Sequence, residues 1–259
     1  MAGRLEGKVA IITGASRGLG QFCSVGYGAE GAKVVIAART EEVKDPQLPG
    51  TIHETAKLVE EAGGEAFPVV CNVADLGSVE KMVAQVMERY GQIDVLMNNA
   101  AVQPPGFIST IEPRHWELEF RVNVHGPFYC CHAALPHMRE RKSGSIINIS
   151  SVAARGGSHY GATKRALEAM TIGLAREQKD SGIAVNALKP VGAIDTPGLR
   201  YGRAPGQTGG ARTSERVRDL PTADNYVEAA ILLAMQTPDT CTGEVFDDAE
   251  AVARLGTTS

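Results

Sequence analysis

Apolar residues in this chain gather in short runs separated by longer amphipathic stretches. Six runs are rich in β-branched residues and nearly continuous in apolar character, and a shorter seventh lies near the C-terminus: 8–12, 33–38, 67–71, 93–97, 145–149, 183–188 and 243–247. A strand buried on both faces has this pattern, whereas a half-exposed strand alternates. The runs therefore predict a parallel sheet of about seven strands, flanked by helices on both faces.

The stretches between the runs carry the period of a helix. Residues 76–91 are the clearest case, with one apolar stripe at Val79, Met82, Val83, Val86 and Met87. Strands that alternate with amphipathic helices are typical of a doubly wound α/β fold. No repeat, low-complexity tract or linker divides the chain, so we expect a single domain over residues 1–259.

Two segments interrupt this alternation. Residues 40–50 hold too much proline and charge for an immediate helix, and residues 190–221 are rich in glycine and proline and too long for a plain connector. Connections of that length are usually functional or disordered. Because the second segment follows a predicted strand, we expect it to form a lid over a substrate. A tolerated surface insertion is the alternative.

Composition narrows the class of protein. Hydrophobic residues make up 43% and charged residues 22%, and the net charge is −4, so no general attraction to nucleic acid or to an anionic membrane is expected. No apolar run approaches the ~20 residues that span a bilayer, and the N-terminus runs directly into a strand without a signal sequence. The five cysteines form no CxxC pair, which predicts no disulfide framework, no metal site and a reduced, cytoplasmic setting. We expect Cys130 and Cys131 to be packed thiols.

A glycine-rich turn, TGASRGLG, follows the first run and opens a helical segment. It places Gly14, Gly18 and Gly20 where the backbone must turn sharply. Such a turn lets the backbone approach a pyrophosphate, whose charge a helix N-terminus favours. A tight strand–helix turn gives the same triad. The strand before it, the helix after it and the second strand beyond favour dinucleotide binding.

A second motif, YGATK, places Tyr160 and Lys164 four residues apart, on one face of a helix. The ordinary pKa of tyrosine, about 10, is too high for an effective base near neutrality, and a neighbouring ammonium lowers it. The pair therefore predicts the acid–base centre of a hydride-transfer enzyme. Two unrelated helix-surface residues are the alternative.

These motifs occur together with NNAA (98–101) and VNVHG (122–126), in the order found in short-chain dehydrogenases/reductases. The chain resembles that family over essentially its whole length. Its AARTEEVKDPQLPGTIHETA segment (37–56) and its AVNALKPVGAIDT segment resemble the hydroxysteroid-dehydrogenase-like branch. The resemblance implies a Rossmann-like fold, an NAD(P) cofactor, oxidoreductase activity on carbonyls or alcohols, and a homodimer or homotetramer.

The resemblance also implies a set of cofactor-binding residues. They are Gly14, Ser16, Arg17, Gly18, Leu19, Gly20, Arg39, Asn72, Val73, Asn99, Ala100, Tyr160, Lys164, Pro190, Ile194 and Thr196. An acidic residue at the end of the second strand would accept hydrogen bonds from the ribose of NAD, but Arg39 stands there. With Arg17 it favours the 2′-phosphate of NADP, so NADP(H) is expected over NAD(H). Alternatively, both arginines are solvated and Glu41 or Glu42 reaches the ribose.

The catalytic residues that the resemblance implies are Asn123, Ser151, Tyr160 and Lys164. The connection between serine and tyrosine is shorter than is usual in the family, with Ser151 nine residues before Tyr160 and Ser150 ten before it. A hydroxyl anchored at a strand end keeps its position when the following loop shortens, which favours Ser151. Ser158 fits a helix N-cap.

The substrate is expected to be a moderately hydrophobic ketone or secondary alcohol, with Phe107 and Trp116 lining its pocket. Five arginines in the predicted lid hint at an anionic substrate such as an acyl-CoA thioester, and a solvated loop is the alternative. Two other functions stay open. One is a dinucleotide-binding sensor without turnover, favoured by the short serine–tyrosine connection and by Pro190-Val191 in place of Pro-Gly. The other is an enoyl-thioester reductase.

Overall fold

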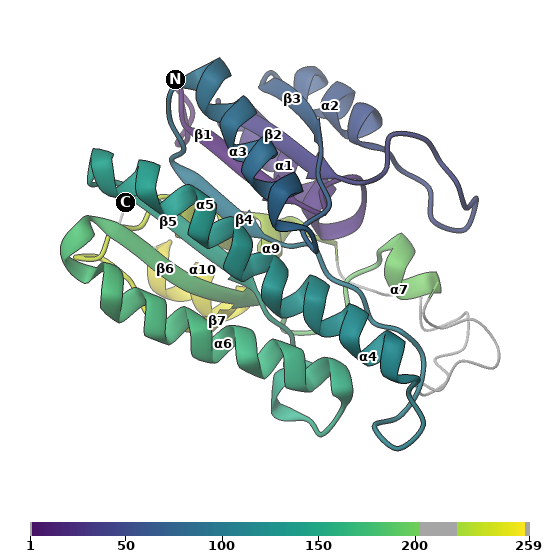
Figure 1. Ribbon diagram of the computed structural model, residues 1–259. Helices are drawn as coiled ribbons and strands as arrows, with labels where there is room; N and C mark the ends of the chain where they lie inside the picture. The colour runs from purple at the N-terminus through teal and green to yellow at the C-terminus, as the bar shows by residue number, and fades with distance from the viewer. Residues whose placement is uncertain (1, 202–221, 257–259) are drawn as a thin grey trace.

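A seven-stranded parallel sheet forms the centre of the computed structural model, which describes residues 2–201 and 222–256. The strands lie in the order β3-β2-β1-β4-β5-β6-β7 (Figure 1). Their bounds are β1 Val9–Thr13, β2 Lys33–Ala38, β3 Glu65–Val70, β4 Val95–Asn98, β5 Gly144–Ile149, β6 Ile183–Lys189 and β7 Val245–Asp247. The expected doubly wound, Rossmann-like α/β fold is confirmed, with each predicted run giving a strand shifted by a few residues at its ends.

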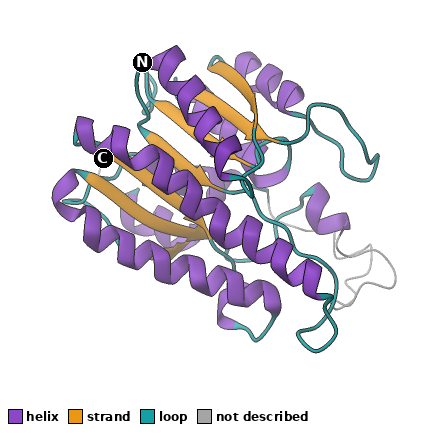
Figure 2. Ribbon diagram, viewed as in Figure 1, coloured by secondary structure: helices purple, strands orange, loops and turns teal. Residues whose placement is uncertain are grey.

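Helices cover both faces of the sheet, as Figure 2 shows. They are α1 Gly18–Ala29, α2 Ile52–Glu61, α3 Leu76–Tyr90, α4 Pro113–Phe120, η1 Arg121–His125, α5 Gly126–Arg141, η2 Val152–Arg155, α6 His159–Gln178, η3 Lys179–Ser181, α7 Pro197–Tyr201, α9 Asp224–Ala234 and α10 Asp248–Leu255. One apolar core joins the sheet to α1, α2, α9 and α10, and the other joins it to α3, α5 and α6. This double cover explains why the strands lack alternation.

Helix α3 illustrates how local sequence sets an element. The Asp75 carboxylate accepts hydrogen bonds from the backbone N–H groups of Gly77 and Ser78, which caps the first turn. Gly91 ends the helix in the left-handed conformation, with φ of 69°. The predicted apolar stripe faces the core, so this helix is confirmed almost to the residue.

Buried polar side chains fasten α6 to the sheet. The side chain of Asn98 donates to that of Asn148 at 2.9 Å, and Asn148 donates to the hydroxyl of Thr171 on α6, also at 2.9 Å. Buried polar groups stabilise a fold only when they are paired, so this chain fixes one orientation of the helix. The first turn of α6, which carries Tyr160, is thereby held at the carboxyl edge of the sheet.

The order of the strands reverses between β1 and β4, and the crevice beyond their carboxyl ends is where doubly wound sheets bind ligands. Residues 40–50 form no helix, as predicted, and α2 begins afterwards with a capping box from Thr51 to Glu54. Of the predicted lid, 190–221, the described part holds α7; residues 202–221 lie outside the described residues.

All five cysteines are free and buried, as expected for packed thiols. Burial raises the pKa of the Cys23 and Cys131 thiols to about 12, which leaves them protonated at neutral pH. Within residues 2–201 and 222–256, no helix combines the length and apolar character that crossing a membrane requires.

Candidate active site

The glycine turn after β1 is locked to the end of β4. Gly14 has φ of +65°, and a Cβ built on it would lie 2.7 Å from the Cα of Ala100. The hydroxyl of Thr13 accepts hydrogen bonds from the backbone N–H groups of Asn99 and Ala100. The Asn99 side chain donates to the carbonyl of Thr13 at 2.8 Å. These contacts bring the two predicted cofactor motifs together and show why only glycine fits at position 14.

The N-terminus of α1 is open to an anion. Its cap residue, Arg17, makes no side-chain capping hydrogen bond, so the first backbone N–H groups have no partner from the cap. Gly18 has φ of +61°, and a Cβ there would meet Thr196 at 3.4 Å. Oriented N–H groups at a helix N-terminus suit a pyrophosphate, so these residues fit the middle of a dinucleotide. Ser16 is buried beneath the turn, and Leu19 packs against the core.

Arg17 and Arg39 lie near one another, although 22 positions separate them in the chain. Burial and the positive charge of Arg39 lower the pKa of Arg17, and the Arg17 guanidinium donates to the carbonyl of Gly50 at 3.1 Å. Arg39 is exposed at the end of β2. The fold thus places two arginines beside the glycine turn, with the carboxylates of Asp45 and Glu54 also close enough to act on Arg17.

The remaining predicted cofactor residues lie at the carboxyl ends of β3 and β6. Asn72 uses its side-chain oxygen to accept from the backbone N–H of Ala74, at 3.2 Å. Val73 is buried. Pro190 follows β6, where the backbone N–H of Val191 donates to Asp248 at 2.5 Å. Ile194 is buried in the core on the α1 side of the sheet.

The four predicted catalytic residues come from η1, from α6 and from the segment between β5 and η2. Tyr160 and Lys164 share one face of α6, with the Lys164 ammonium 5.5 Å from the centre of the Tyr160 ring. Lys164 is buried and donates to the carbonyl of Ile149 at 2.7 Å. The hydroxyl of Tyr160 makes no hydrogen bond to any residue that the structure describes. It is therefore available to a ligand.

The two serines after β5 differ in burial and in their hydrogen bonds. Ser150 is buried and donates to the Glu168 carboxylate at 2.7 Å, so its hydroxyl is occupied. Ser151 is half-buried and its hydroxyl only accepts, from the backbone N–H of Ala153 at 3.2 Å. Its proton is free for a substrate oxygen. Ser158 caps α6 by accepting from the N–H of Gly161, as predicted.

Asn123 lies in η1, a π-helical turn between α4 and α5. Its side chain accepts from the backbone N–H of Val102 and donates to the carbonyl of Val102, both at 2.9 Å, and donates to Thr163 on α6 at 3.1 Å. A π-helical turn inside an α-helix often marks a functional site. Asn123 therefore ties the loop after β4 to the turn of α6 that carries Lys164.

The electrostatics of Tyr160 differ from the sequence-based expectation. Burial, and then the negative charge of Glu119, raise the pKa of Tyr160 above its ordinary value, whereas Lys164 was expected to lower it. Burial also lowers the pKa of Lys164, to about 8. A lysine buried this deeply is partly neutral in mildly alkaline solution, which weakens its effect on the phenol. Tyr160 is thus set to hold its proton.

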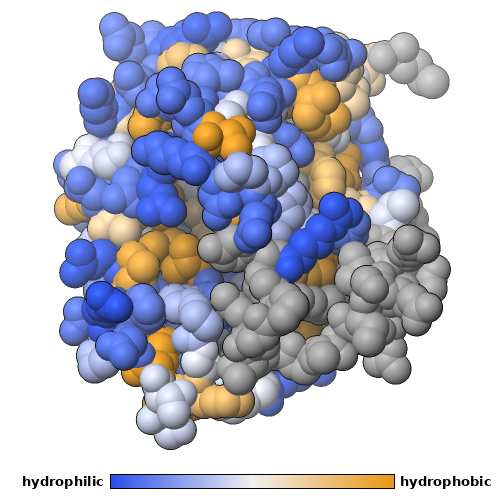
Figure 3. Space-filling model, turned by 90° about the vertical axis from the view of Figure 1, so that its right-hand side faces the viewer, coloured by the Kyte–Doolittle hydropathy of each residue, from blue (hydrophilic) through white to orange (hydrophobic). Residues whose placement is uncertain are grey.

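The two residues predicted to line the substrate pocket lie in α4 and in the loop before it. Phe107 is exposed in the loop before α4, and the ring of Trp116 packs on Phe120 at 4.7 Å. On the face drawn in Figure 3, hydrophobic residues form separate patches among hydrophilic ones. Arg200 pairs with Asp195, and the other four lid arginines lie outside the described residues.

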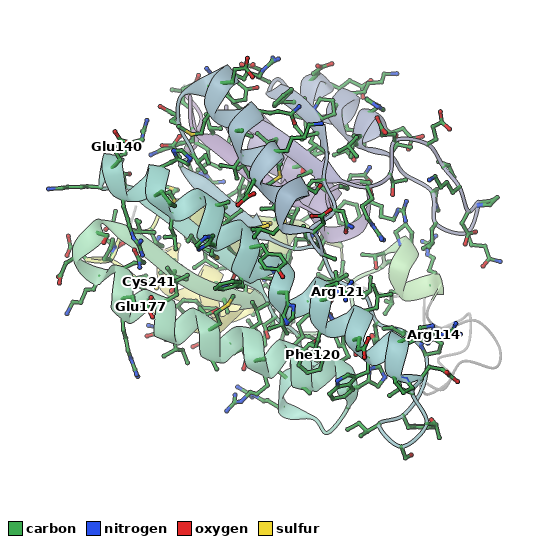
Figure 4. All side chains as sticks on the ribbon, in the orientation of Figure 1. Arg114, Phe120, Arg121, Glu140, Glu177 and Cys241 are labelled. Atoms are coloured by element: carbon green, nitrogen blue, oxygen red, sulfur yellow. The ribbon has the colours of Figure 1, made fainter. Side chains whose placement is uncertain are left out.

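Sequence reasoning missed a buried pair beside Tyr160. Glu119 has no exposed surface and lies 2.7 Å from a ring nitrogen of His159, which itself is 3% exposed. Figure 4 labels Phe120 and Arg121, which follow Glu119 where α4 meets η1. Glu119 packs against α6, but α4 has only 8 residues. The apolar pattern of so short a helix does not show which of its charged residues will be buried.

Replacing Ser151 with alanine should lower kcat/KM roughly 10- to 100-fold with little change in stability, because a hydrogen bond to the reacting oxygen is lost. Ser150→Ala is the matched control. It should reduce the free energy of unfolding by about 1–3 kcal/mol, since Glu168 loses its donor, while turnover stays close to wild type. Steady-state kinetics and denaturant unfolding of both variants measure this. The reverse pattern would assign the role to Ser150.

Comparison with known proteins places this geometry in context. The family model described as short chain dehydrogenase matches residues 8–204. The chain is 32% identical over 261 residues to hydroxysteroid dehydrogenase-like protein 2 of Danio rerio, covering 98% of this chain and 60% of that protein. It is also 32% identical over 257 residues to 1,6-dihydroxycyclohexa-2,4-diene-1-carboxylate dehydrogenase of Pseudomonas putida, covering 93% and 90%.

A solved structure has a similar fold. A metagenomic short-chain oxidoreductase crystallised in complex with NADP superposes with a TM-score of 0.75 at 28% identity, covering 94% of this chain and 97% of that one. The family match covers most of the chain and includes the glycine turn and the Tyr160–Lys164 pair. The chain therefore belongs to the short-chain dehydrogenase family, whose members are NAD(P)-dependent oxidoreductases.

Proposed function

We propose that this protein interconverts a carbonyl and a secondary alcohol by hydride transfer. Tyr160 is the acid–base group, Lys164 orients the cofactor and Ser151 holds the substrate oxygen. A bound nicotinamide cofactor supplies or accepts the hydride. The observation that carries this proposal is the free hydroxyl of Tyr160, with the Lys164 ammonium 5.5 Å from the centre of its ring.

We consider the direction of reduction, for which the protonated phenol that burial favours is the starting form. In that direction Tyr160 must enter protonated and give its proton to the substrate oxygen as carbon accepts hydride. Ser151 donates a hydrogen bond to the same oxygen and stabilises its developing negative charge. Asn123 keeps the turn around Lys164 in place through Thr163.

Exposed apolar side chains near the catalytic residues support the proposed substrate class. Phe107, Ile108 and Val152 are each more than half exposed, on the loop before α4 and on η2 next to Ser151. Exposed apolar side chains in this number beside a polar site suit a moderately hydrophobic ketone or secondary alcohol.

The homodimer or homotetramer that the family resemblance implies stays a prediction, which light scattering tests.

For the cofactor we propose NADP(H) over NAD(H), supported by the two arginines beside the glycine turn, Arg17 and Arg39. Arg39→Ser should raise the KM for NADPH roughly 10- to 100-fold and leave the KM for NADH almost unchanged, because only NADPH carries the 2′-phosphate. Arg114→Ser, on the exposed start of α4, is the control and should change neither. Equal effects of Arg39→Ser on both cofactors would contradict the preference.

The experiment that tests the function is oxidation of NADPH or NADH, followed at the nicotinamide absorbance, over a panel of hydrophobic ketones, aldehydes and enoyl thioesters. Product analysis separates carbonyl reduction from reduction of a double bond. Turnover of ketones that depends on Tyr160 supports the proposal. Tight binding of cofactor without turnover in either direction would instead favour the dinucleotide-binding sensor.

A further inference from the structure

Glu119 and His159 form a buried junction between three segments of the molecule. One carboxylate oxygen of Glu119, Oε2 on α4, lies 2.7 Å from Nδ1 of His159, the first residue of α6. The other ring nitrogen of His159, Nε2, lies 3.0 Å from the carbonyl oxygen of Gly106, in the loop before α4. The junction therefore joins α4, α6 and this loop immediately beside Tyr160.

The partners of His159 fix how many protons the pair holds. A carbonyl oxygen only accepts hydrogen bonds, so Nε2 of His159 carries a hydrogen toward Gly106. The contact between Nδ1 and Oε2 then needs a further hydrogen, which belongs either to the carboxyl group or to the ring. In both placements the pair is neutral overall. Glu119 and His159 thus share one proton.

The second oxygen of Glu119 supports this count. Oε1 is buried and has no hydrogen-bond partner among the described residues. An unpaired oxygen of a buried carboxylate costs much more free energy than the carbonyl oxygen of a neutral carboxyl group. Burial accordingly raises the pKa of Glu119, although His159 opposes the shift. The environment favours retention of the shared proton at neutral pH.

The junction is coupled to the reacting groups. A negative charge on Glu119 raises the pKa of Tyr160 and, against the stronger effect of burial, that of Lys164. Tyr226 on α9 also interacts electrostatically with Tyr160. While Glu119 and His159 share their proton, the pair places no net charge beside Tyr160 or Lys164.

The junction also has a mechanical role. The connection from Ser151 to Tyr160 is short, and His159 fastens its end to α4 and to Gly106. We propose that Glu119 and His159 are positioning residues for the reaction at Tyr160: they hold one shared proton and anchor the first turn of α6, which fixes the position of the Tyr160 hydroxyl. This inference rests on the proposed reductase function.

The test uses Glu119→Gln, which keeps the shape and can still donate a hydrogen bond to Nδ1 but adds no charge. Reduction needs Tyr160 and Lys164 protonated, so the wild-type rate should fall above pH about 8, where Lys164 titrates. Because the pair carries no net charge, Glu119→Gln should keep this falling limb at the wild-type pH and most of the wild-type kcat, whereas Glu119→Ala, which removes the partner of Nδ1, should lower kcat roughly 10-fold. The Kd of the cofactor should stay the same. Glu117→Gln, exposed on the same helix, should keep the wild-type profile.

A second measurement needs no turnover. Proton NMR of the wild-type protein should show two downfield, exchange-protected resonances at neutral pH, one from the shared proton and one from the Nε2 hydrogen that Gly106 holds; Glu119→Gln should lose only the first and His159→Asn should lose both. A pH profile of Glu119→Gln displaced from that of wild type, a kcat of Glu119→Ala equal to that of wild type, or both resonances surviving in Glu119→Gln would overturn the inference. Absence of turnover in the wild type would defeat the proposed function instead, and the first resonance would still decide whether the pair holds its proton.

Discussion

Tyr160→Phe should lower kcat by about 100- to 10,000-fold, which is the range that a positioned general acid contributes. The variant loses one hydroxyl, and that hydroxyl makes no hydrogen bond to any described residue. Its removal therefore leaves no partner unsatisfied, so the fold and cofactor binding should persist. Single-turnover oxidation of NADPH with a ketone substrate, beside a fluorescence titration of the cofactor, separates the two effects.

The matched control is Tyr129→Phe, which removes a half-buried hydroxyl from α5. It should keep wild-type turnover. Activity in Tyr160→Phe within a few-fold of wild type would contradict the role of Tyr160, whereas loss of cofactor binding in that variant would show that Tyr160 holds the dinucleotide.

Gly14→Ala should reduce the free energy of unfolding by about 2–4 kcal/mol and abolish cofactor binding. The left-handed backbone at φ of +65° disfavours any side chain, and the new Cβ would lie 2.7 Å from the Cα of Ala100. A backbone atom cannot rotate away, so the glycine turn and the end of β4 must separate. Denaturant unfolding and cofactor titration measure the two losses.

Gly7 provides the comparison for that experiment. It has nearly the same backbone angle, φ of +69°, but nothing lies within 4 Å of the position of its Cβ. Gly7→Ala should therefore cost only the conformational part, about 1 kcal/mol, and leave cofactor binding intact. Equal losses in the two variants would show that the contact with Ala100 is unimportant.

Much of the fold could be predicted from the sequence because its signals are local. Continuous apolar runs report burial on both faces, and the stripe of α3 with its cap at Asp75 reports a helix, whatever the rest of the chain does. The glycine triad and the Tyr160–Lys164 spacing are likewise local, since one depends on backbone angles and the other on the helical repeat. Strand ends were less accurate, because hydrogen bonds to a neighbouring strand decide where pairing stops.

Only the tertiary structure decided between alternatives that depend on distant partners. Ser150 and Ser151 are adjacent and identical in type, and Glu168 on α6 occupies the first and leaves the second free. The pKa of Tyr160 is raised and not lowered, because burial of Tyr160 dominates and Glu119 adds to it. Short segments of sequence do not determine burial.

The sequence by itself determined the sheet, the glycine turn and the spacing of the acid–base pair, because each rests on a repeat within one segment. Tertiary packing decided that the Ser151 hydroxyl is free, that Arg17 and Arg39 are close enough to interact electrostatically, and that Glu119 is buried against His159. Those outcomes depend on side chains 18 to 40 positions apart brought into one environment, where desolvation and charge set which groups keep their protons.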